Sequence, residues 1–290
     1  MTQIIPSLAT ISADYHAVFC DLWGCLHNGI RAHDAAVGAL RAFRATGGTV
    51  ILLTNAPRQR ASVEQQLERF HTPRDCWDAI ATSGDSARVA MFQGAIGENV
   101  YFIGQPHDEV FFDPINIVTD PTPIQRTDLD HATGILCCGP FDPYADPATL
   151  RPTFLSAIAR GLKMLCANPD IIVDRGEKRE WCAGALARLY REMGGETLMF
   201  GKPHPPIYDL ARRRLLELGQ DVADERILCI GDGIQTDILG AQGEALDSLF
   251  ITGGLAAGET RTSHQPDPEA LARFLQTAPA TPTYAMGQLR

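Results

Sequence analysis

Short continuous apolar runs recur along the chain and alternate with segments that have helical spacing. Four of the runs are AVFC (17–20), VILLT (50–54), ILCIG (227–231) and SLFIT (248–252). Because polar residues do not alternate with apolar ones within them, they are typical of strands buried on both faces. Such strands form a mostly parallel sheet covered by helices on both sides. The pattern therefore predicts an α/β fold with a Rossmann-like core.

Two segments beside these runs support this interpretation. In HDAAVGALRAFRATGG (33–48), apolar residues recur near helical spacing and two glycines follow, where a helix would end. PPIYDLARRRLLELG (205–219) repeats the design, with proline at the start and glycine just after the end. Strands and helices thus alternate, as they do in βαβ units.

A second group of apolar runs occupies the middle of the chain: VYFIG (100–104), GILCCG (134–139) and LKMLCAN (162–168). It separates two halves that each resemble part of one sheet. The sequence therefore predicts an inserted α/β cap domain over residues 83–184, with residues 1–82 and 185–290 forming the core. The Pro-, Thr- and Ala-rich tail, residues 277–290, is expected to be an extended arm.

Composition narrows the classes of partner. The 290 residues carry a net charge of −10, and no basic block is present. This argues against nucleic acid or an anionic membrane as the main partner. It leaves a small anionic substrate open, because a few local donors can outweigh a distant diffuse field. No apolar run approaches the roughly 20 residues of a membrane span, and the N-terminus lacks a secretory pattern.

Cysteine usage indicates the compartment. The eight cysteines are scattered and form no CxxC pair. Neither a zinc site nor a disulfide framework is therefore indicated, and a cytoplasmic location is expected.

Polar and charged residues directly follow several strand-like runs. Because ligands bind at the carboxyl ends of the strands in open α/β sheets, these residues are expected to share one crevice. They are Asp21, Thr54, Asn55, Lys202, Asp232 and Asp237.

This combination suits phosphoryl transfer. Asp21 and Asp232 offer the hard oxygen ligands that Mg²⁺ prefers. Thr54, Asn55 and the following helix N-terminus offer donors to phosphate oxygens. Lys202 adds a positive charge that neutralises a phosphoryl group during transfer. An Asp beside a metal can itself attack phosphorus and form an aspartyl-phosphate.

Each residue alone also has a simpler interpretation. An Asp after a strand is often a turn residue or a helix cap, as Asp21 would be. The pair Thr54–Asn55 is typical of a cap, and Asp237 is typical of the first turn of a helix. A lone lysine is usually solvated. The prediction of a site rests on their joint arrival at strand ends.

Four motifs together resemble the haloacid dehalogenase superfamily of phosphohydrolases. Its first motif is matched by VFCDLWGCLHNG (18–29), its second by ILLTN (51–55), its third by GKPHPPIY (201–208) and its fourth by IGDGIQTDI (230–238). The insertion between motifs two and three, which contains GPFD and ANPDIIV, is similar to the class IIA branch. That branch includes nucleotide-monophosphate, pyridoxal-phosphate and sugar-phosphate phosphatases.

The resemblance implies a role for each matched residue. Asp21 would be the nucleophile and a Mg²⁺ ligand. Three further contributors to the metal site would be the backbone carbonyl of Trp23, Asp232 and the supporting carboxylate Asp237. Three residues would bind phosphate: Thr54, Asn55 and Lys202, of which Lys202 is also catalytic.

The sequence departs from the family at Trp23. The family's phosphatases carry a second Asp there, which protonates the leaving alcohol and then deprotonates the attacking water. An indole N–H is a donor only, so Trp23 cannot transfer these protons. General acid–base help is typically worth about 10²–10⁴-fold. His27, the imidazole within the motif, is a candidate substitute acid/base; its alternative is an ordinary loop histidine.

The resemblance therefore implies Mg²⁺-dependent hydrolysis of phosphate monoesters of a small metabolite, sugar-phosphate-like or nucleotide-like, through an aspartyl-phosphate. Alternatives are a phosphate-ligand-binding protein with little or no turnover, and a phosphonate or haloacid hydrolase. Asp142, Asn168 and Asp170 on cap loops are candidate substrate contacts, although such residues are also common in turns. The class IIA branch often dimerises through its cap, so the resemblance is compatible with a homodimer.

Overall fold

The computed structural model describes residues 2–114, 118–175 and 178–290. By their internal contacts these residues divide into two compact units, which are described separately. The first unit consists of Met1–Thr54, Glu64–Ala81 and Lys202–Arg290. The second unit consists of Asn55–Val63 and Thr82–Gly201.

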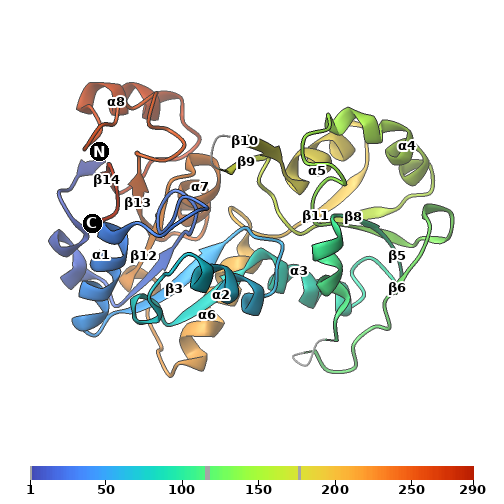
Figure 1. Ribbon diagram of the computed structural model, residues 1–290, viewed down its shortest axis with the longest axis horizontal. Coiled ribbons are helices and arrows are strands. Elements are labelled where there is room, and N and C mark those ends of the chain that lie inside the picture. Colours follow the sequence, from blue (N-terminus) through green and yellow to red (C-terminus); the bar gives the residue numbers. More distant parts are fainter. Residues whose placement is uncertain (1, 115–117, 176–177) are drawn as a thin grey trace. The chain divides into compact units, whose positions relative to one another are not determined.

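The first unit is built on a sheet with the strand order β1-β14-β13-β12-β2-β3-β4. Figure 1 labels β14, β13, β12 and β3 of this sheet. Its strands are β1 (Gln3–Ile4), β2 (Ala17–Cys20), β3 (Thr49–Thr54), β4 (Ala79–Thr82), β12 (Ile227–Gly231), β13 (Asp247–Ile251) and β14 (Tyr284–Met286). Every neighbouring pair from β1 to β3 is parallel. The carboxyl ends of β2, β3 and β12 therefore lie at one edge of the sheet.

The central strands of this sheet are buried along their whole length. Every residue of β2, β3 and β12 is buried, as their unbroken apolar runs predict. The helices of this unit are α1 (Asp34–Ala45), α6 (Pro205–Glu217), α7 (Leu239–Gly243) and α8 (Pro268–Thr277); α2 (Arg60–Arg69) runs from the second unit into the first. Phe19 and Ile51 pack in one cluster with Ile207 of α6. Phe250 and Ala285 pack with Leu271 of α8.

The second unit has its own parallel sheet, with the order β11-β8-β7-β5-β6. Its elements are α3 (Ser83–Phe92), β5 (Asn99–Ile103), β6 (Gln125–Arg126), β7 (Gly134–Cys137), α4 (Arg151–Ala159), β8 (Lys163–Cys166), β9 (Ile172–Arg175), β10 (Lys178–Trp181), α5 (Ala183–Glu192) and β11 (Glu196–Met199). The strands β9 and β10 pair antiparallel.

Helices cover both faces of this second sheet. Ile135 of β7 packs in one cluster with Phe154 of α4 and Leu186 of α5. Its neighbour Leu136 belongs to the other cluster, with Met91 of α3. Successive side chains of a strand point to opposite faces, so α3 lies on one side of the sheet and α4 with α5 on the other.

The α/β fold class is confirmed, and the structure adds detail at two places. The second unit extends to Gly201, because β11 pairs with β8 of its sheet, and the cap boundary at residue 184 stays a prediction. The tail was expected to be an extended arm; its residues 284–286 form β14 and pair in parallel with both β1 and β13.

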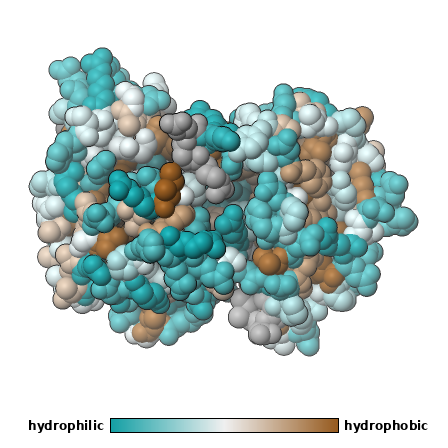
Figure 2. Space-filling view, viewed as in Figure 1, coloured by the Kyte–Doolittle hydropathy of each residue, from teal (hydrophilic) through white to brown (hydrophobic). Residues whose placement is uncertain are grey.

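The hydrophilic character of the surface agrees with the burial of the apolar strands. Hydrophilic residues cover much of each unit on the face drawn in Figure 2. Within the described ranges, no helix combines the length and apolar character that a membrane crossing requires.

Two buried tyrosines provide a matched test of the packing. The Tyr208 hydroxyl has no hydrogen-bond partner among the described residues, whereas the Tyr190 hydroxyl donates to Leu162 O at 2.6 Å. An unsatisfied buried hydroxyl costs free energy, so Tyr208→Phe should leave the free energy of unfolding unchanged or raise it by about 1 kcal/mol. Tyr190→Phe should lower it by about 1–2 kcal/mol. Calorimetry measures both, and equal destabilisation by the two changes would contradict the assignment.

Candidate active site

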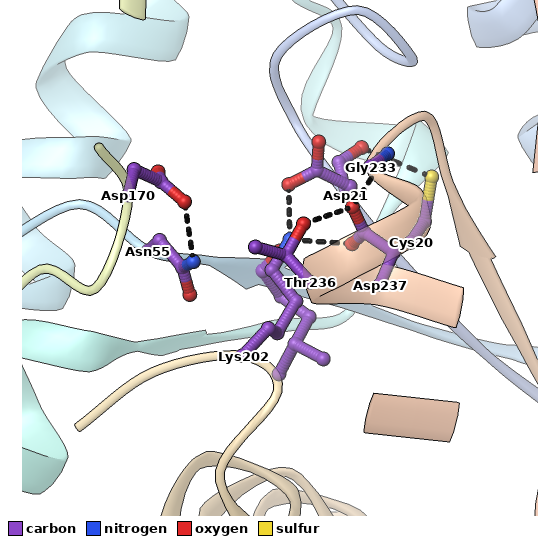
Figure 3. Close-up of polar contacts among 9 residues, drawn as sticks. Cys20, Asp21, Asn55, Asp170, Lys202, Gly233, Thr236 and Asp237 are labelled. Atoms are coloured by element: carbon purple, nitrogen blue, oxygen red, sulfur yellow. Dashed lines mark hydrogen bonds and ion pairs between the residues drawn. The ribbon is translucent and has the colours of Figure 1, made fainter. Parts of the chain in front are cut away.

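The centre of the candidate site is the side chain of Lys202. Its Nζ atom donates to Asp21 Oδ1 at 2.5 Å, to Asp237 Oδ1 at 2.7 Å and to Leu53 O at 3.1 Å (Figure 3). Lys202 and Asp237 are 3% and 4% exposed. Asp21 follows β2, and Leu53 lies in β3. The carboxyl ends of neighbouring parallel strands thus bring together residues that are far apart in the sequence.

The charges of this cluster depend on one another. Burial acts to lower the pKa of Lys202, but the carboxylates of Asp21 and Asp237 raise it well above its ordinary value. Lys202 is therefore charged at neutral pH. Burial, together with the charges of Asp237 and Asp232, raises the pKa of Asp21, while Lys202 opposes this rise. Three carboxylates share one ammonium here, so the ionised cluster has excess negative charge.

Asp232 follows β12 and lies where two glycine backbones approach it closely. Its Oδ2 atom accepts a hydrogen bond from Leu255 N at 3.1 Å. A Cβ at Gly24 would lie 2.2 Å from Asp232 Oδ2, and one at Gly254 would lie 2.0 Å from the same atom. Gly24 also has a φ of +76°, which favours glycine. Gly24 therefore serves both the turn after Asp21 and the space for Asp232.

The donor set fits a divalent cation. Ligand atoms of Asp21, Cys25 and Asp232 all lie within 4.8 Å of one another. The two carboxylates are hard oxygen ligands of the kind that Mg²⁺ prefers. A cation there would also offset the excess negative charge. Burial and the neighbouring Asp232 raise the pKa of the Cys25 thiol, so it lines this group as a neutral side chain.

The sequence pattern alone does not predict Cys25 in this group. The only sequence signal was its place directly after Gly24 in the first motif.

Asp237 lies in a short π-helix, η8 (Ile234–Ile238), and holds Lys202. Its Oδ2 atom accepts hydrogen bonds from Gly233 N at 3.1 Å and Thr236 Oγ1 at 3.2 Å. Its Oδ1 atom accepts from Lys202. Both carboxylate oxygens are thus engaged, which favours orientation of the lysine as its role. Its assignment as a supporting metal carboxylate stays a prediction.

The loop that leaves the site packs Trp23 and His27 together. Trp23 is half-buried, and a Cβ at Gly29 would lie 2.3 Å from its ring. Its ring meets the His27 ring edge-on at a centroid distance of 5.1 Å. His27 in turn meets Phe70 edge-on at 5.0 Å. The indole of Trp23 therefore packs against residues of its own loop.

His27 is fully buried within this packing. Its Nδ1 atom accepts a hydrogen bond from Gly29 N at 3.1 Å, and its Nε2 atom has no hydrogen-bond partner among the described residues. Burial lowers the pKa of His27 to about 4. A buried, neutral imidazole is poorly suited to exchange protons with a substrate, so this geometry favours a packing role.

The remaining predicted residues lie at the end of β3 and in the second unit. Thr54, the last residue of β3, is buried, and so is Asn55, which belongs to the second unit. The Asn55 Nδ2 atom donates to Asp170 Oδ1 at 2.8 Å. Asn168 Oδ1 accepts from Asp170 N at 3.0 Å, and the exposed Asp142 accepts from Tyr144 N at 2.9 Å. Asn168 and Asp142 thus shape local turns.

The fold is of the α/β class, and its candidate site lies where carboxylates follow the carboxyl ends of parallel strands. Comparison with known proteins agrees. Residues 18–117 match a family described as haloacid dehalogenase-like hydrolase, and residues 199–278 match one described as HAD-hydrolase-like. A solved structure of a hydrolase of the haloacid dehalogenase-like family from Brucella suis 1330 is 35% identical. The match covers 99% of this chain and 100% of that one, with a TM-score of 0.85.

The chain belongs to the haloacid dehalogenase-like hydrolase family, which confirms the resemblance seen in its motifs. Two curated relatives are more distant. Human glycerol-3-phosphate phosphatase is 25% identical over 88% of this chain and 84% of its own length. Ribonucleotide monophosphatase NagD of Escherichia coli K12 is 22% identical over 83% of this chain and 88% of its own.

The burial of His27 predicts how stability changes with pH. Its pKa is about 4 in the folded protein against 6.5 unfolded. The unfolded state therefore binds the proton more tightly, and stability is lost as pH falls from about 6.5 to about 4. The stability advantage of the wild type over His27→Gln should shrink across this window, by at most about 3 kcal/mol.

Denaturant unfolding at several pH values measures this difference, with His131→Gln, an exposed histidine, as the control. A difference that stays constant from pH 7 to pH 4 would mean that His27 titrates normally and is accessible for proton transfer.

Proposed function

We propose that this hydrolase is a Mg²⁺-dependent phosphatase that acts on phosphate monoesters of small metabolites through an aspartyl-phosphate. The observation that carries the proposal is the hydrogen-bonded group of Asp21, Lys202 and Asp237 at the carboxyl ends of the strands. The names of the curated relatives, which act on glycerol 3-phosphate and on ribonucleotide monophosphates, support a small phosphorylated substrate.

In the proposed reaction a carboxylate oxygen of Asp21 attacks phosphorus. The new O–P bond forms as the bond from phosphorus to the leaving oxygen breaks, and water then hydrolyses the aspartyl-phosphate. Lys202 stays charged and neutralises the transferring group, while Thr54 and Asn55 donate to its oxygens. Asp237 keeps the Lys202 ammonium in place.

The metal would be held by Asp21, Asp232 and the backbone carbonyl of Trp23, with Asp237 as a supporting carboxylate. When bound, Mg²⁺ supplies positive charge that lowers the cost of bringing an anionic substrate to anionic carboxylates.

Neither Trp23 nor His27 is suited to transfer protons in the proposed reaction. Trp23 lacks an acidic proton, and His27 is buried with a pKa of about 4. This observation favours a second candidate, a phosphate-binding protein with little turnover.

We also propose a cytoplasmic location, which the burial of all eight cysteines as free thiols supports. A homodimer through the cap remains a proposal from the family resemblance.

Asp21→Asn tests the nucleophile. The change removes the attacking oxygen and a metal ligand but little volume, so turnover should fall at least a thousandfold while the fold persists. Phosphate release with and without Mg²⁺ measures it, against Asp130→Asn, an exposed control. Retention of more than about a tenth of the activity would refute the role of Asp21. Absence of turnover in the wild type, with retained phosphate binding, would favour the binding protein.

Trp23 predicts a dependence on the leaving group. The aryloxide group of an aryl phosphate leaves without protonation, so aryl phosphates should react far faster than alkyl phosphates. Hydrolysis of the aspartyl-phosphate gains nothing from a better leaving group and becomes the slow step. Rapid-quench kinetics with an aryl phosphate should therefore show a product burst close to one equivalent per site, followed by a slow steady state.

Trp23→Asp should shorten the lifetime of the phosphoenzyme, and Trp23→Phe, which keeps an aromatic ring against Gly29, should not. Linear product formation from the first turnover, with equal rates for aryl and alkyl esters, would show that another group transfers the proton.

A further inference from the structure

The Asn55 side chain is fixed by residues that are distant in the sequence. Its Nδ2 atom donates to Asp170 Oδ1 at 2.8 Å across 115 residues (Figure 3). A Cβ at Gly201 would lie 2.7 Å from Asn55 Oδ1, so the amide oxygen lies against the backbone of Gly201. Gly201 directly precedes Lys202. Both ends of the amide are therefore held by segments of the second unit.

The loop that carries Asp170 is itself fixed in place. Asp170 N donates to Asn168 Oδ1 at 3.0 Å, and Asp170 O accepts from Gly184 N of α5 at 3.0 Å. A Cβ at Gly184 would lie 2.1 Å from Pro169 O, so helix and loop are in close contact. Ser83 Oγ donates to Ala167 O at 2.6 Å. These contacts fix the position of Asp170, and its carboxylate in turn fixes the Asn55 amide.

We infer that Asp170 is a positioning residue for Asn55 and acts on phosphate binding through it; this rests on the proposed phosphatase function. An ionised carboxylate accepts hydrogen bonds and cannot donate them. It therefore selects the amide orientation with nitrogen toward Asp170 and disfavours the flipped one. The same nitrogen carries a second hydrogen, whose direction is then fixed as well. Direct contact between Asp170 and a phosphate would instead be repulsive.

This role separates Asp170 from a residue that reads the substrate directly. Asp170→Ala removes the acceptor and should weaken phosphate binding roughly tenfold. Asp170→Asn keeps an oxygen that can accept from Asn55 and should stay within about threefold of the wild type. Because Asp170 acts through Asn55, the double variant Asn55→Ala/Asp170→Ala should bind phosphate as Asn55→Ala does.

The experiment is calorimetric titration of the full chain with inorganic phosphate in the presence of Mg²⁺. The control is Asp146→Ala, an exposed Asp of the same unit whose carboxylate accepts from Ala148 N at 2.8 Å and which should leave phosphate affinity unchanged. Thermal unfolding of each variant shows whether it is folded. Steady-state kinetics with an aryl phosphate should place the effect of Asp170→Ala mainly in KM.

Each outcome either supports or overturns the inference. Loss in Asp170→Ala, rescue in Asp170→Asn and non-additivity with Asn55→Ala together support it. Additive losses, or equal losses in the Ala and Asn variants, overturn it. If the wild type binds phosphate and turns over but Asp170→Ala binds equally well, this inference alone fails. If the wild type neither binds phosphate nor hydrolyses esters, the proposed function fails and the inference falls with it.

Discussion

The arrangement of the candidate site in the first unit depends on one buried ammonium group. Lys202 donates to two carboxylates and to a backbone carbonyl of β3, and so connects three segments of the chain at the sheet edge. Removing one partner of a buried charge pair typically costs about 3–5 kcal/mol, because the other charge is left uncompensated. The lysine can therefore be neither lost nor moved cheaply. The excess of carboxylates around Lys202 makes the cluster suitable for a cation. Together with the ammonium, that cation would offset the negative charge and allow an anionic substrate to bind.

The loop after Asp21 shows how packing changes chemistry without changing the fold. Trp23 packs on Gly29 and His27, and His27 packs on Phe70. Trp23 stands where the phosphatases that this chain resembles carry a second Asp, and an indole cannot exchange protons as a carboxylate can. The loop keeps the backbone carbonyl that a metal could use. In the proposed mechanism, this loop would therefore allow phosphate binding and aspartyl-phosphate formation without efficient protonation of the leaving group.

The sequence was informative where a pattern is local and uninformative where a contact is distant. VILLT could be predicted as a buried strand because its apolar run needs no knowledge of its neighbours, and Asp21 could be placed at a strand end for the same reason. The strand β14 could not be predicted, since Tyr284–Met286 is short and depends on β1 and β13 for its pairing. The contact of Asn55 with Asp170 and the burial of His27 against Phe70 depend on the tertiary structure alone.

The most direct test of the central claim is to detect the phosphoryl group on the enzyme. The wild type, mixed with Mg²⁺ and an aryl phosphate and quenched in acid within the burst, is analysed by intact-protein and peptide mass spectrometry. The account predicts an added mass of one phosphoryl group on the peptide that contains Asp21, and none on Asp21→Asn. Product release without any phosphorylated protein, or a phosphoryl group on a different residue, would contradict it.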